Sequence, residues 1–507
     1  MGWYDAPSPA AQEIHALHHA TSIAPYDPFA GPREHCGVVG LWNVLEPAHH
    51  AYHALYALQH RGQESAGIAV CSAQGRIERH AAMGLVPNVF SQQDLETLDA
   101  LYQGRPGGAI GHNRYSTTGA SEHENTQPFV GYTAGGMVAL AHNGNIVNAK
   151  QIRDGLEADG RAFTSTTDTE VVLQLLARAV DEEDPLAWAL AQLEGAFSLV
   201  VLMPDRVELA RDPHGWRPLV IGELEHPDGS GVVGWVGASE TVALDAIGAR
   251  FLREVEPGEI VTLSDEGITS RRFNEASRTA HCVFEHVYFA SPASRVFGST
   301  VQLVRERLGE RLARESPVEA DLVTPMPDSG RSAATGFARA SGLPYREAII
   351  PNRYVGRTFI KPTMGERAAA VRLKLNVVGE IVEGQRIVVV DDSIVRGTTT
   401  RLKMDQLRGA GAKEIHLRIS CPPIRHACYF GVDFPDRSEL IATDRTPEDI
   451  ARILGVDSVA YLSIDGLHGV VGTEDVPGDR YCDACFSGRY PITIEGELRK
   501  DALTKNC

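Results

Sequence analysis

The spacing of apolar runs along the chain changes once, near residues 270–280. Before this point, short apolar runs are separated by Gly and polar turns, a pattern typical of stacked antiparallel sheets flanked by helices. After it, helical stretches alternate with short β-branched runs, which indicates a parallel sheet. We therefore predict an α+β sandwich of antiparallel sheets between helices over residues 36–275, and an α/β domain with a parallel sheet over residues 276–507.

Length and charge limit the class of protein further. A chain of 507 residues, 43% of them hydrophobic, is globular and too long for one core. Residues 1–35 lack a basic start followed by an apolar stretch, so we predict a flexible leader rather than a secretory signal. No apolar run approaches the ~20 residues of a membrane helix, and we expect a cytoplasmic protein. The net charge of −18 argues against binding to nucleic acid.

The most specific stretch is residues 386–400, RIVVVDDSIVRGTTT. A buried strand ends on Asp391 and Asp392, and a turn rich in Ser, Gly and Thr then leads into a helix. Free amides at a helix N-terminus and nearby hydroxyls form a phosphate cradle, while the two carboxylates suit ribose hydroxyls or Mg²⁺. A capped strand-to-helix loop explains the residue types but not an acidic pair beside a phosphate cradle. The stretch therefore predicts a phosphorylated ribose as ligand. The side-chain hydroxyls of the phosphate cradle belong to Ser393, Thr398 and Thr399.

This stretch resembles the motif with which type I phosphoribosyltransferases bind 5-phosphoribosyl 1-pyrophosphate (PRPP). The resemblance implies that residues 327–331, PDSGR, form a pyrophosphate loop and that Ser329 joins the acidic pair around Mg²⁺. It also implies that the basic segment Asn352–Asn376 closes over the substrate. The PRPP-binding residues that the resemblance implies are Asp328, Ser329, Arg331, Arg357, Lys361, Asp391, Asp392, Ser393, Arg396, Gly397, Thr398 and Thr399.

Five short segments of the N-terminal half resemble the glutaminase domain of N-terminal-nucleophile (Ntn) amidotransferases. Alone, a cysteine before an apolar run is most often a core residue, but here it accompanies the other segments. The resemblance implies that Cys36 attacks the side-chain amide of glutamine and forms a thioester. The segments are residues 34–40 (EHCGVVG), 60–65 (HRGQES), 112–117 (HNRYST), 142–145 (HNGN) and 165–170 (STTDTE).

The same resemblance assigns the groups around the nucleophile. Arg114, Thr117 and Asp168 bind glutamine, with the Arg114 fork matching the α-carboxylate and Asp168 the α-ammonium. The side chain of Asn143 and the backbone N–H of Gly144 form the oxyanion hole.

The proton acceptor is then the α-amino group of Cys36, which requires removal of residues 1–35. The alternative is a Cys–His–Asn triad that uses His112 or His142. We find no G-x-C-x-G nucleophile elbow in support of a conventional nucleophile.

The eight cysteines of a chain in a reducing compartment are expected to be metal ligands, catalytic thiols or core residues. The resemblance, which includes residues 281–285 (HCVFE) and 481–491 (YCDACFSGRYP), implies a [4Fe–4S] cluster on four of them. A tetrahedral Zn²⁺ fits the same number of ligands, and Cys421 is an alternative to Cys428. We interpret Cys71 as a core residue and assign no role to Cys507. The cluster ligands are Cys282, Cys428, Cys482 and Cys485.

Taken together, residues 34–491 resemble the amidophosphoribosyltransferase family, in its iron–sulfur-containing type with a propeptide. The family reaction converts glutamine, PRPP and water to 5-phosphoribosylamine, pyrophosphate and glutamate; the resemblance also implies a homotetramer and inhibition by purine nucleotides. Glutamine:fructose-6-phosphate aminotransferases share the glutaminase half but lack the motif at residues 391–400. A PRPP-sensing regulator would need a basic helix-turn-helix, and none is visible.

Overall fold

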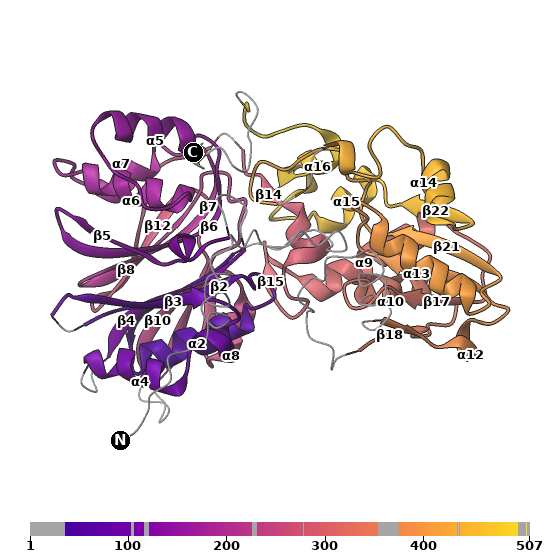
Figure 1. Cartoon of the computed structure of the whole chain (residues 1–507), viewed down its shortest axis with the longest axis horizontal. Helices are drawn as coiled ribbons and strands as arrows, with labels where there is room; N and C mark the ends of the chain where they lie inside the picture. The colour runs from indigo at the N-terminus through magenta and orange to yellow at the C-terminus, as the bar shows by residue number, and fades with distance from the viewer. Residues whose placement is uncertain are drawn as a thin grey trace, which may run out of the picture.

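A computed structural model describes residues 36–72, 74–102, 106–115, 121–225, 231–276, 278–352, 375–432, 434, 437–494 and 503. Figure 1 shows two halves side by side, a strand-rich N-terminal half and a C-terminal half in which helices surround a smaller sheet. The predicted fold class is confirmed.

Two antiparallel sheets face each other in the N-terminal half. Their strand orders are β11-β9-β10-β1-β4-β2-β3 and β13-β12-β8-β7-β6-β5. The first sheet consists of β1 (Gly37–Val44), β2 (Ser65–Cys71), β3 (Ile77–Met83), β4 (Gly107–Arg114), β9 (Val220–Glu225), β10 (Val232–Ala238) and β11 (Arg250–Glu254). The second consists of β5 (Phe129–Thr133), β6 (Gly136–Ile146), β7 (Gly195–Met203), β8 (Arg206–Arg211), β12 (Glu259–Ser264) and β13 (Gly267–Arg272).

Apolar side chains from the two inner faces, such as Ile110 and Val200, form the core between the sheets. Helices cover the two outer faces. The sequence pattern predicts helices over residues 48–59 and 168–179, which correspond to α2 and α6. The first sheet is covered by α2 (Pro47–Ala57), α3 (Val86–Val89), α4 (Gln92–Asp99) and α8 (Thr241–Ala246), and the second by α5 (Ala149–Ala158), α6 (Asp168–Arg178) and α7 (Pro185–Leu190).

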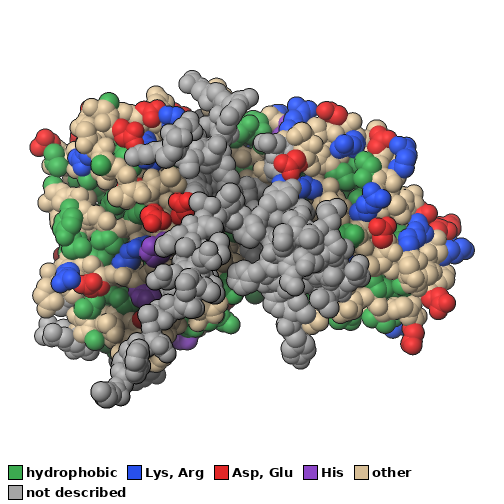
Figure 2. Space-filling model, viewed as in Figure 1, with side chains coloured by type: hydrophobic (Ala, Val, Ile, Leu, Met, Phe, Trp, Pro, Cys, Tyr) green, Lys and Arg blue, Asp and Glu red, His purple; other side chains and the backbone are tan. Residues whose placement is uncertain are grey.

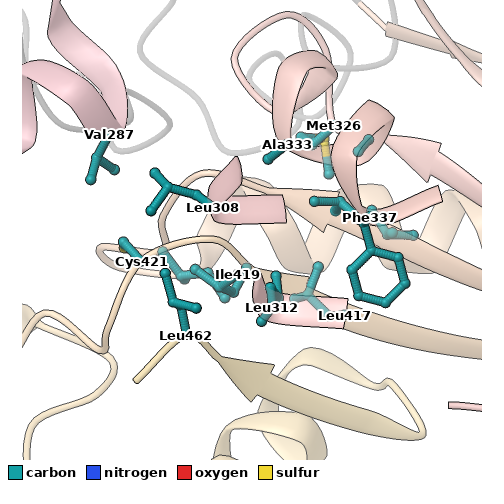
Figure 3. Packing of buried hydrophobic residues seen from close by; sticks show 14 of the residues in the cluster. Val287, Leu308, Leu312, Met326, Ala333, Phe337, Leu417, Ile419, Cys421 and Leu462 are labelled. Carbon is teal, nitrogen blue, oxygen red and sulfur yellow. The ribbon is translucent and has the colours of Figure 1, made fainter. Parts of the chain in front are cut away.

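The C-terminal half is built on a parallel sheet of order β17-β20-β21-β22. In Figure 3, Leu308 and Leu312 of α9, Phe337 of α10 and Leu417 of β21 belong to one buried apolar cluster. The predicted alternation of helix and strand is therefore confirmed. The elements are α9 (Val301–Glu315), β17 (Leu322–Pro325), α10 (Arg331–Ser341), α12 (Gly379–Val382), β20 (Arg386–Asp391), α13 (Thr398–Gly409), β21 (Glu414–Ile419), α14 (Pro447–Leu454), β22 (Ser458–Tyr461) and α15 (Ile464–Val471).

Two details differ from the sequence pattern or fall outside the described residues. The sequence pattern predicts a helix over Gly298–Ala313, but α9 begins at Val301, because Gly298 has a φ of 76° and Ser299–Thr300 forms β16, which pairs with β15 (Arg295–Val296). A hairpin of β18 (Ile349–Pro351) and β19 (Leu375–Val377) follows. Between its strands lie Arg357 and Lys361, which are outside the described residues.

The C-terminal segment returns to the junction between the halves. Strand β23 (Tyr481–Cys482) pairs in parallel with β14 (His281–Cys282), which places Cys482 opposite Cys282. Helix α16 (Ala484–Ser487) follows and lies beside β14 in Figure 1. Leu503 is buried in the core cluster beneath α5, α6 and α7. The last described residues thus bind the two halves together.

The surface shows no single dominant charge on the face in Figure 2, where acidic and basic side chains are interspersed over the coloured part of the C-terminal half. Large apolar side chains such as Tyr132 and Leu303 are exposed singly. Within the described ranges, no helix is both long enough and apolar enough to cross a bilayer.

Candidate functional site

The cysteine that the sequence singles out lies at the start of a central strand. Cys36 is buried and precedes β1, whose pairing with β4 places Gly37 opposite Asn113. The Cys36 Sγ atom therefore lies beside the end of β4, 3.4 Å from the carbonyl oxygen and 3.5 Å from the backbone nitrogen of Tyr115. Burial raises the pKa of the Cys36 thiol to about 11. At neutral pH the sulfur is protonated, so its reaction requires a proton acceptor.

Neither histidine of the alternative triad contacts the thiol. The Nε2 atom of His112 lies 3.0 Å from the carbonyl oxygen of His142, and burial lowers the pKa of His112 to about 3. The Nδ1 atom of His142 lies 3.6 Å from Asp168 Oδ1. Within the part of the chain that the structure describes, no hydrogen bond joins either ring to Cys36. The contacts do not favour a Cys–His–Asn triad.

The end of β6 carries the two residues that the resemblance assigns to the oxyanion hole, and it lies near β4, since the Nε2 atom of His112 is 3.0 Å from the carbonyl oxygen of His142. Asn143 is fully buried, and neither polar atom of its side chain has a hydrogen-bond partner among the described residues. An unpaired buried amide costs about 1–3 kcal/mol, which indicates a group that a ligand completes. Gly144 has a φ of 152°, and a Cβ there would lie 2.0 Å from the carbonyl oxygen of Ala196. Only glycine allows this close approach.

Two charged residues that the resemblance assigns to glutamine binding act electrostatically on Cys36. Arg114 is buried at the end of β4 and forms an ion pair with Glu64. Asp168 begins α6 and accepts a hydrogen bond of 3.1 Å from the Ile146 backbone. Burial raises the pKa of Asp168, but the interaction with His142 and hydrogen bonds from backbone N–H groups together outweigh burial, so that the net shift is downward and the carboxylate is ionised at neutral pH. The charges of both residues act on the Cys36 thiol.

Some residues of this site lie outside the prediction or outside the structure. Thr117 is not among the described residues. Glu64 belongs to the HRGQES segment at residues 60–65, but the resemblance assigns it no role. Its position opposite Arg114, set by the pairing of Ser65 with Arg114 between β2 and β4, becomes clear only from the sheet register.

A second site lies at the carboxyl ends of β17 and β20, where Pro325 pairs with Val390. The loop before α10 folds over this edge, and a Cβ on Gly330 would lie 2.4 Å from the carbonyl oxygen of Val390. Helix α13 begins at Thr398 after Gly397, which has a φ of 78°. The N-termini of α10 and α13 thus open on one edge of a parallel sheet, the usual place for a phosphorylated ligand.

Asp391 and Asp392 lie at this edge and are both buried. Hydroxyls of Ser393 and Ser329 donate to Asp392, the former at 2.5 Å. Burial and the adjacent carboxylate raise the pKa of Asp391 well above its ordinary value, and burial raises that of Asp392. Two buried carboxylates that repel each other form a site for a cation or for hydroxyl donors.

Two arginines of the predicted PRPP set pair with carboxylates in this structure. Arg331 donates to Asp328 at 3.0 Å and forms an ion pair with Glu347. Arg396 donates to Glu439 at 2.7 Å. Their roles in substrate binding stay predictions.

The four cysteines predicted to bind a cluster come together at the junction of the halves. Burial raises the pKa of all four thiols, and neighbouring thiols raise it further in Cys282, Cys482 and Cys485. The charges of Asp391 and Asp392 raise the pKa of Cys421, and Cys421 in turn contributes to the raised pKa of Cys485. The alternative ligand thus lies between the acidic pair and the cysteine group.

Backbone hydrogen bonds and an apolar cluster surround the four thiols. Backbone N–H groups of Arg425 and His426 donate to the carbonyl oxygen of Cys485 at 3.0 and 3.1 Å, which places the segment that leads to Cys428. Trp216 and Phe430 stack 4.4 Å apart and belong to the same apolar cluster as Cys428 and Cys482. Among the described residues, no three or more Cys, His, Asp or Glu side chains close around a single metal ion.

Comparison with known proteins bears on both sites. Residues 112–246 match the model of the glutamine amidotransferase domain. The chain is 48% identical to the amidophosphoribosyltransferase of Archaeoglobus fulgidus over 91% of its length and 99% of that relative. It is 43% identical to that of Bacillus subtilis over 94% of its length and 99% of the relative.

Solved structures agree over nearly the whole fold. The glutamine PRPP amidotransferase from B. subtilis, complexed with ADP and GMP, has a TM-score of 0.84 at 42% identity and covers 92% of this chain and 100% of that one. The structure of the allosteric regulatory enzyme of purine biosynthesis has a TM-score of 0.86 at 42% identity, over 93% and 99%. The chain belongs to the amidophosphoribosyltransferase family, and it transfers ammonia from L-glutamine to PRPP in purine biosynthesis.

Proposed function

We propose that Cys36 is the nucleophile that hydrolyses glutamine and that the acidic edge of the C-terminal sheet binds PRPP. The observation that carries the first assignment is a buried, protonated thiol on which the charges of Arg114 and Asp168 act, while among the described residues no histidine is hydrogen-bonded to the sulfur. Removal of residues 1–35 frees the α-amino group of Cys36. This amine accepts the thiol proton, since its typical pKa is about 7.7–8.0.

The sulfur then attacks the side-chain amide carbon of glutamine. The C–N bond breaks, ammonia leaves with the proton that the amine returns, and water hydrolyses the thioester to glutamate. Asn143 Nδ2 and the N–H of Gly144 donate to the oxyanion of the tetrahedral intermediate. Arg114, with Thr117, binds the α-carboxylate, and Asp168 binds the α-ammonium. The ion pair with Glu64 fixes the Arg114 fork before the substrate arrives.

At the second site, ammonia attacks the anomeric carbon of PRPP as pyrophosphate leaves. Residues 327–331, with Asp328, Ser329 and Arg331, bind pyrophosphate, assisted by Arg357 and Lys361. The turn that opens α13 binds the other phosphate through backbone amides and hydroxyls. Asp391 and Asp392 bind the ribose hydroxyls. The phosphate-binding residues of this turn are Ser393, Arg396, Gly397, Thr398 and Thr399.

The acidic pair also suits Mg²⁺. Two adjacent buried carboxylates with raised pKa values and a serine hydroxyl provide the hard oxygen donors that this ion prefers. We propose that Ser329, Asp391 and Asp392 bind it, directly or through water. When bound, Mg²⁺ neutralises charge that develops on the departing pyrophosphate.

We further propose that Cys282, Cys428, Cys482 and Cys485 bind a [4Fe–4S] cluster. The mutual effects of their thiols on one another's pKa support this set, and the apolar shell around them suits thiolate ligands. Bound there, the cluster would connect β14 to the C-terminal segment, a structural role.

We predict that anaerobically purified protein is brown and contains about four iron and four sulfide per chain. Cys428→Ser should lose the colour and most of the iron, because it removes one of four thiolates. Cys71→Ser is the matched control, since Cys71 is buried in β2 of the other half. Colourless protein with one zinc per chain would contradict the cluster and favour the tetrahedral alternative.

A second prediction concerns the reactivity of Cys36 with iodoacetamide. In the chain that keeps residues 1–35, alkylation should be slow at pH 8 and rise toward pH 11, because only about a thousandth of the thiol is ionised at pH 8 when its pKa is about 11. In the chain that begins at Cys36, the reaction should already be fast near pH 8. Mass spectrometry of the Cys36 peptide measures both rates, and equal rates would exclude the amine as proton acceptor.

We also propose that the enzyme is a cytoplasmic homotetramer inhibited by purine nucleotides. The B. subtilis relative was solved with ADP and GMP. Light scattering and activity assays with these two nucleotides test the proposal.

A further inference from the structure

Four fully buried charged side chains meet where the two halves join. Arg61, Arg217 and Glu240 come from the N-terminal half, and Glu285 comes from the C-terminal half. The two arginines and the two glutamates give this group a net charge of zero. Buried charges are stable only when each is paired and hydrogen-bonded.

Glu285 is the member that joins the two guanidinium groups. Its Oε1 atom accepts from Arg61 at 2.8 Å and from Arg217 at 3.3 Å, and its Oε2 atom accepts from Arg61 at 3.1 Å. One carboxylate therefore sets the positions of two arginines that lie 156 residues apart in the sequence (217 minus 61).

Each of these arginines leads to a different part of the glutaminase site. Arg61 Nε donates to the carbonyl oxygen of Cys36 itself, at 3.2 Å. Arg217 donates to the carbonyl oxygen of Phe430. The next residue, Gly431, packs on β6, the strand that carries Asn143 and Gly144 and is called the oxyanion strand below. A Cβ on Gly431 would lie 3.2 Å from the carbonyl carbon of Gly144.

A neighbouring contact strengthens this second connection. The side chain of Asn145, which follows Gly144 on β6, donates to the carbonyl oxygen of Tyr429 at 2.8 Å. Residues 429–431 are thus attached to the oxyanion strand on one side and, through Arg217, to Glu285 on the other.

Glu285 is itself placed by the PRPP-binding half. It begins the π-helix Glu285–Phe289, a form that often marks functional sites. Buried Arg305 of α9 donates to the carbonyl oxygens of His286 and Ala290 at 2.8 and 2.9 Å. The charge of the same guanidinium acts on Asp392. The π-helix that carries the Glu285 carboxylate is therefore hydrogen-bonded to an arginine whose charge also acts on the PRPP site.

We propose that Glu285 is a positioning residue of the glutaminase centre, supplied by the C-terminal half. Its carboxylate orients Arg61 against the backbone of Cys36 and Arg217 against residues 429–431, which support the oxyanion strand. The glutaminase centre is therefore complete only when both halves are docked. This inference rests on the proposed role of Cys36 as nucleophile.

The test is Glu285→Gln, which keeps the shape of the side chain and removes its charge. Glutamine-dependent kcat should fall about 100-fold, because a displacement of about 1 Å at a catalytic group costs that much. The KM for glutamine should stay within about twofold, since Arg114 and Asp168 are untouched. Ammonia-dependent synthesis should also be unchanged, which shows that the PRPP half is folded.

Glu208→Gln is the matched control. Glu208 is buried and accepts from two arginines, Arg206 at 2.8 Å and Arg271 at 3.2 Å, but it lies on β8 away from both sites. It should leave both activities at the wild-type level.

Arg217→Lys is a second variant in case Glu285→Gln does not fold. It keeps the charge opposite Glu285 and gives up the donation to Phe430, so glutamine-dependent kcat should again fall selectively. Wild-type glutamine turnover in either folded variant, equal loss of both activities, or the same loss in Glu208→Gln would overturn the proposal. If alkylation of Cys36 leaves glutamine hydrolysis by the wild type intact, the nucleophile assignment itself fails, and the positioning role fails with it.

Discussion

Replacing Cys36 with alanine should abolish glutamine-dependent synthesis of phosphoribosylamine while ammonia-dependent synthesis continues. Loss of a covalent nucleophile lowers kcat by more than about 10⁴-fold in comparable enzymes. The PRPP site contains no contribution from Cys36, so ammonia supplied in solution should react at a rate within about twofold of wild type. The measurement compares product formation from glutamine with product formation from ammonium chloride at pH 8–9.

Cys71→Ala is the control for this variant. Cys71 is a buried cysteine of β2 in the same half, and its alanine variant should retain glutamine-dependent synthesis. If folded Cys36→Ala loses both activities, the two reactions do not take place at separate sites.

Asp391→Asn and Asp392→Asn should each lower PRPP-dependent synthesis by about 10²–10³-fold with either nitrogen source, because electrostatic stabilisation of this size is lost when one charged or hydrogen-bonding group is removed. Although both substitutions lower activity, each should raise the stability of the folded protein. Burial raises the pKa of both carboxyls in the folded protein. A group whose folded pKa is raised destabilises the fold at any pH above its unfolded pKa. At pH 7 without Mg²⁺, each Asn variant should therefore unfold at a higher temperature than wild type.

Asp321→Asn provides the comparison. Asp321 directly precedes β17, at the amino ends of the strands of the same sheet, and pairs with Arg386 at 2.9 Å. Hydrogen bonds from Arg386 lower the pKa of Asp321 to about 2, so this carboxylate favours the folded state at neutral pH. The Asp321→Asn variant should unfold at a lower temperature than wild type and keep its activity. If Asp391→Asn and Asp392→Asn both lower the unfolding temperature, the acidic pair is structural.

Much of this arrangement can be predicted from local sequence. The β-branched run at residues 387–390 predicts a strand over 386–390, and the observed β20 extends one residue further, to Asp391. The acidic residues at its end must lie at the carboxyl ends of the strands of a parallel sheet. Gly144, which the resemblance assigns to the oxyanion hole, has a φ of 152° and a Cβ position blocked by the carbonyl oxygen of Ala196, so glycine is required there. Such predictions succeed because backbone conformation and burial pattern depend on neighbouring residues.

The charged network at the junction could not be predicted in this way. Glu285 and Arg217 stand beside apolar residues such as Phe284 and Trp216, but nothing in the sequence indicates that the two charged groups meet. Their burial depends on how two domains pack, and the partners of Glu285 lie 68 and 224 residues away. The Arg114–Glu64 pair was missed for a similar reason, since it depends on the register between β2 and β4.

The contact between Arg217 and Phe430 has a consequence for synthesis on the ribosome. The two residues are separated by 213 positions. At about 5–20 residues per second, about 10–40 s pass between the emergence of the arginine and that of its carbonyl partner. During this interval the nascent N-terminal half can form its sheets, but the support for its oxyanion strand has not yet been translated. If this contact supports the oxyanion strand as proposed, an incomplete chain should not release ammonia from glutamine before the domain that consumes the ammonia exists.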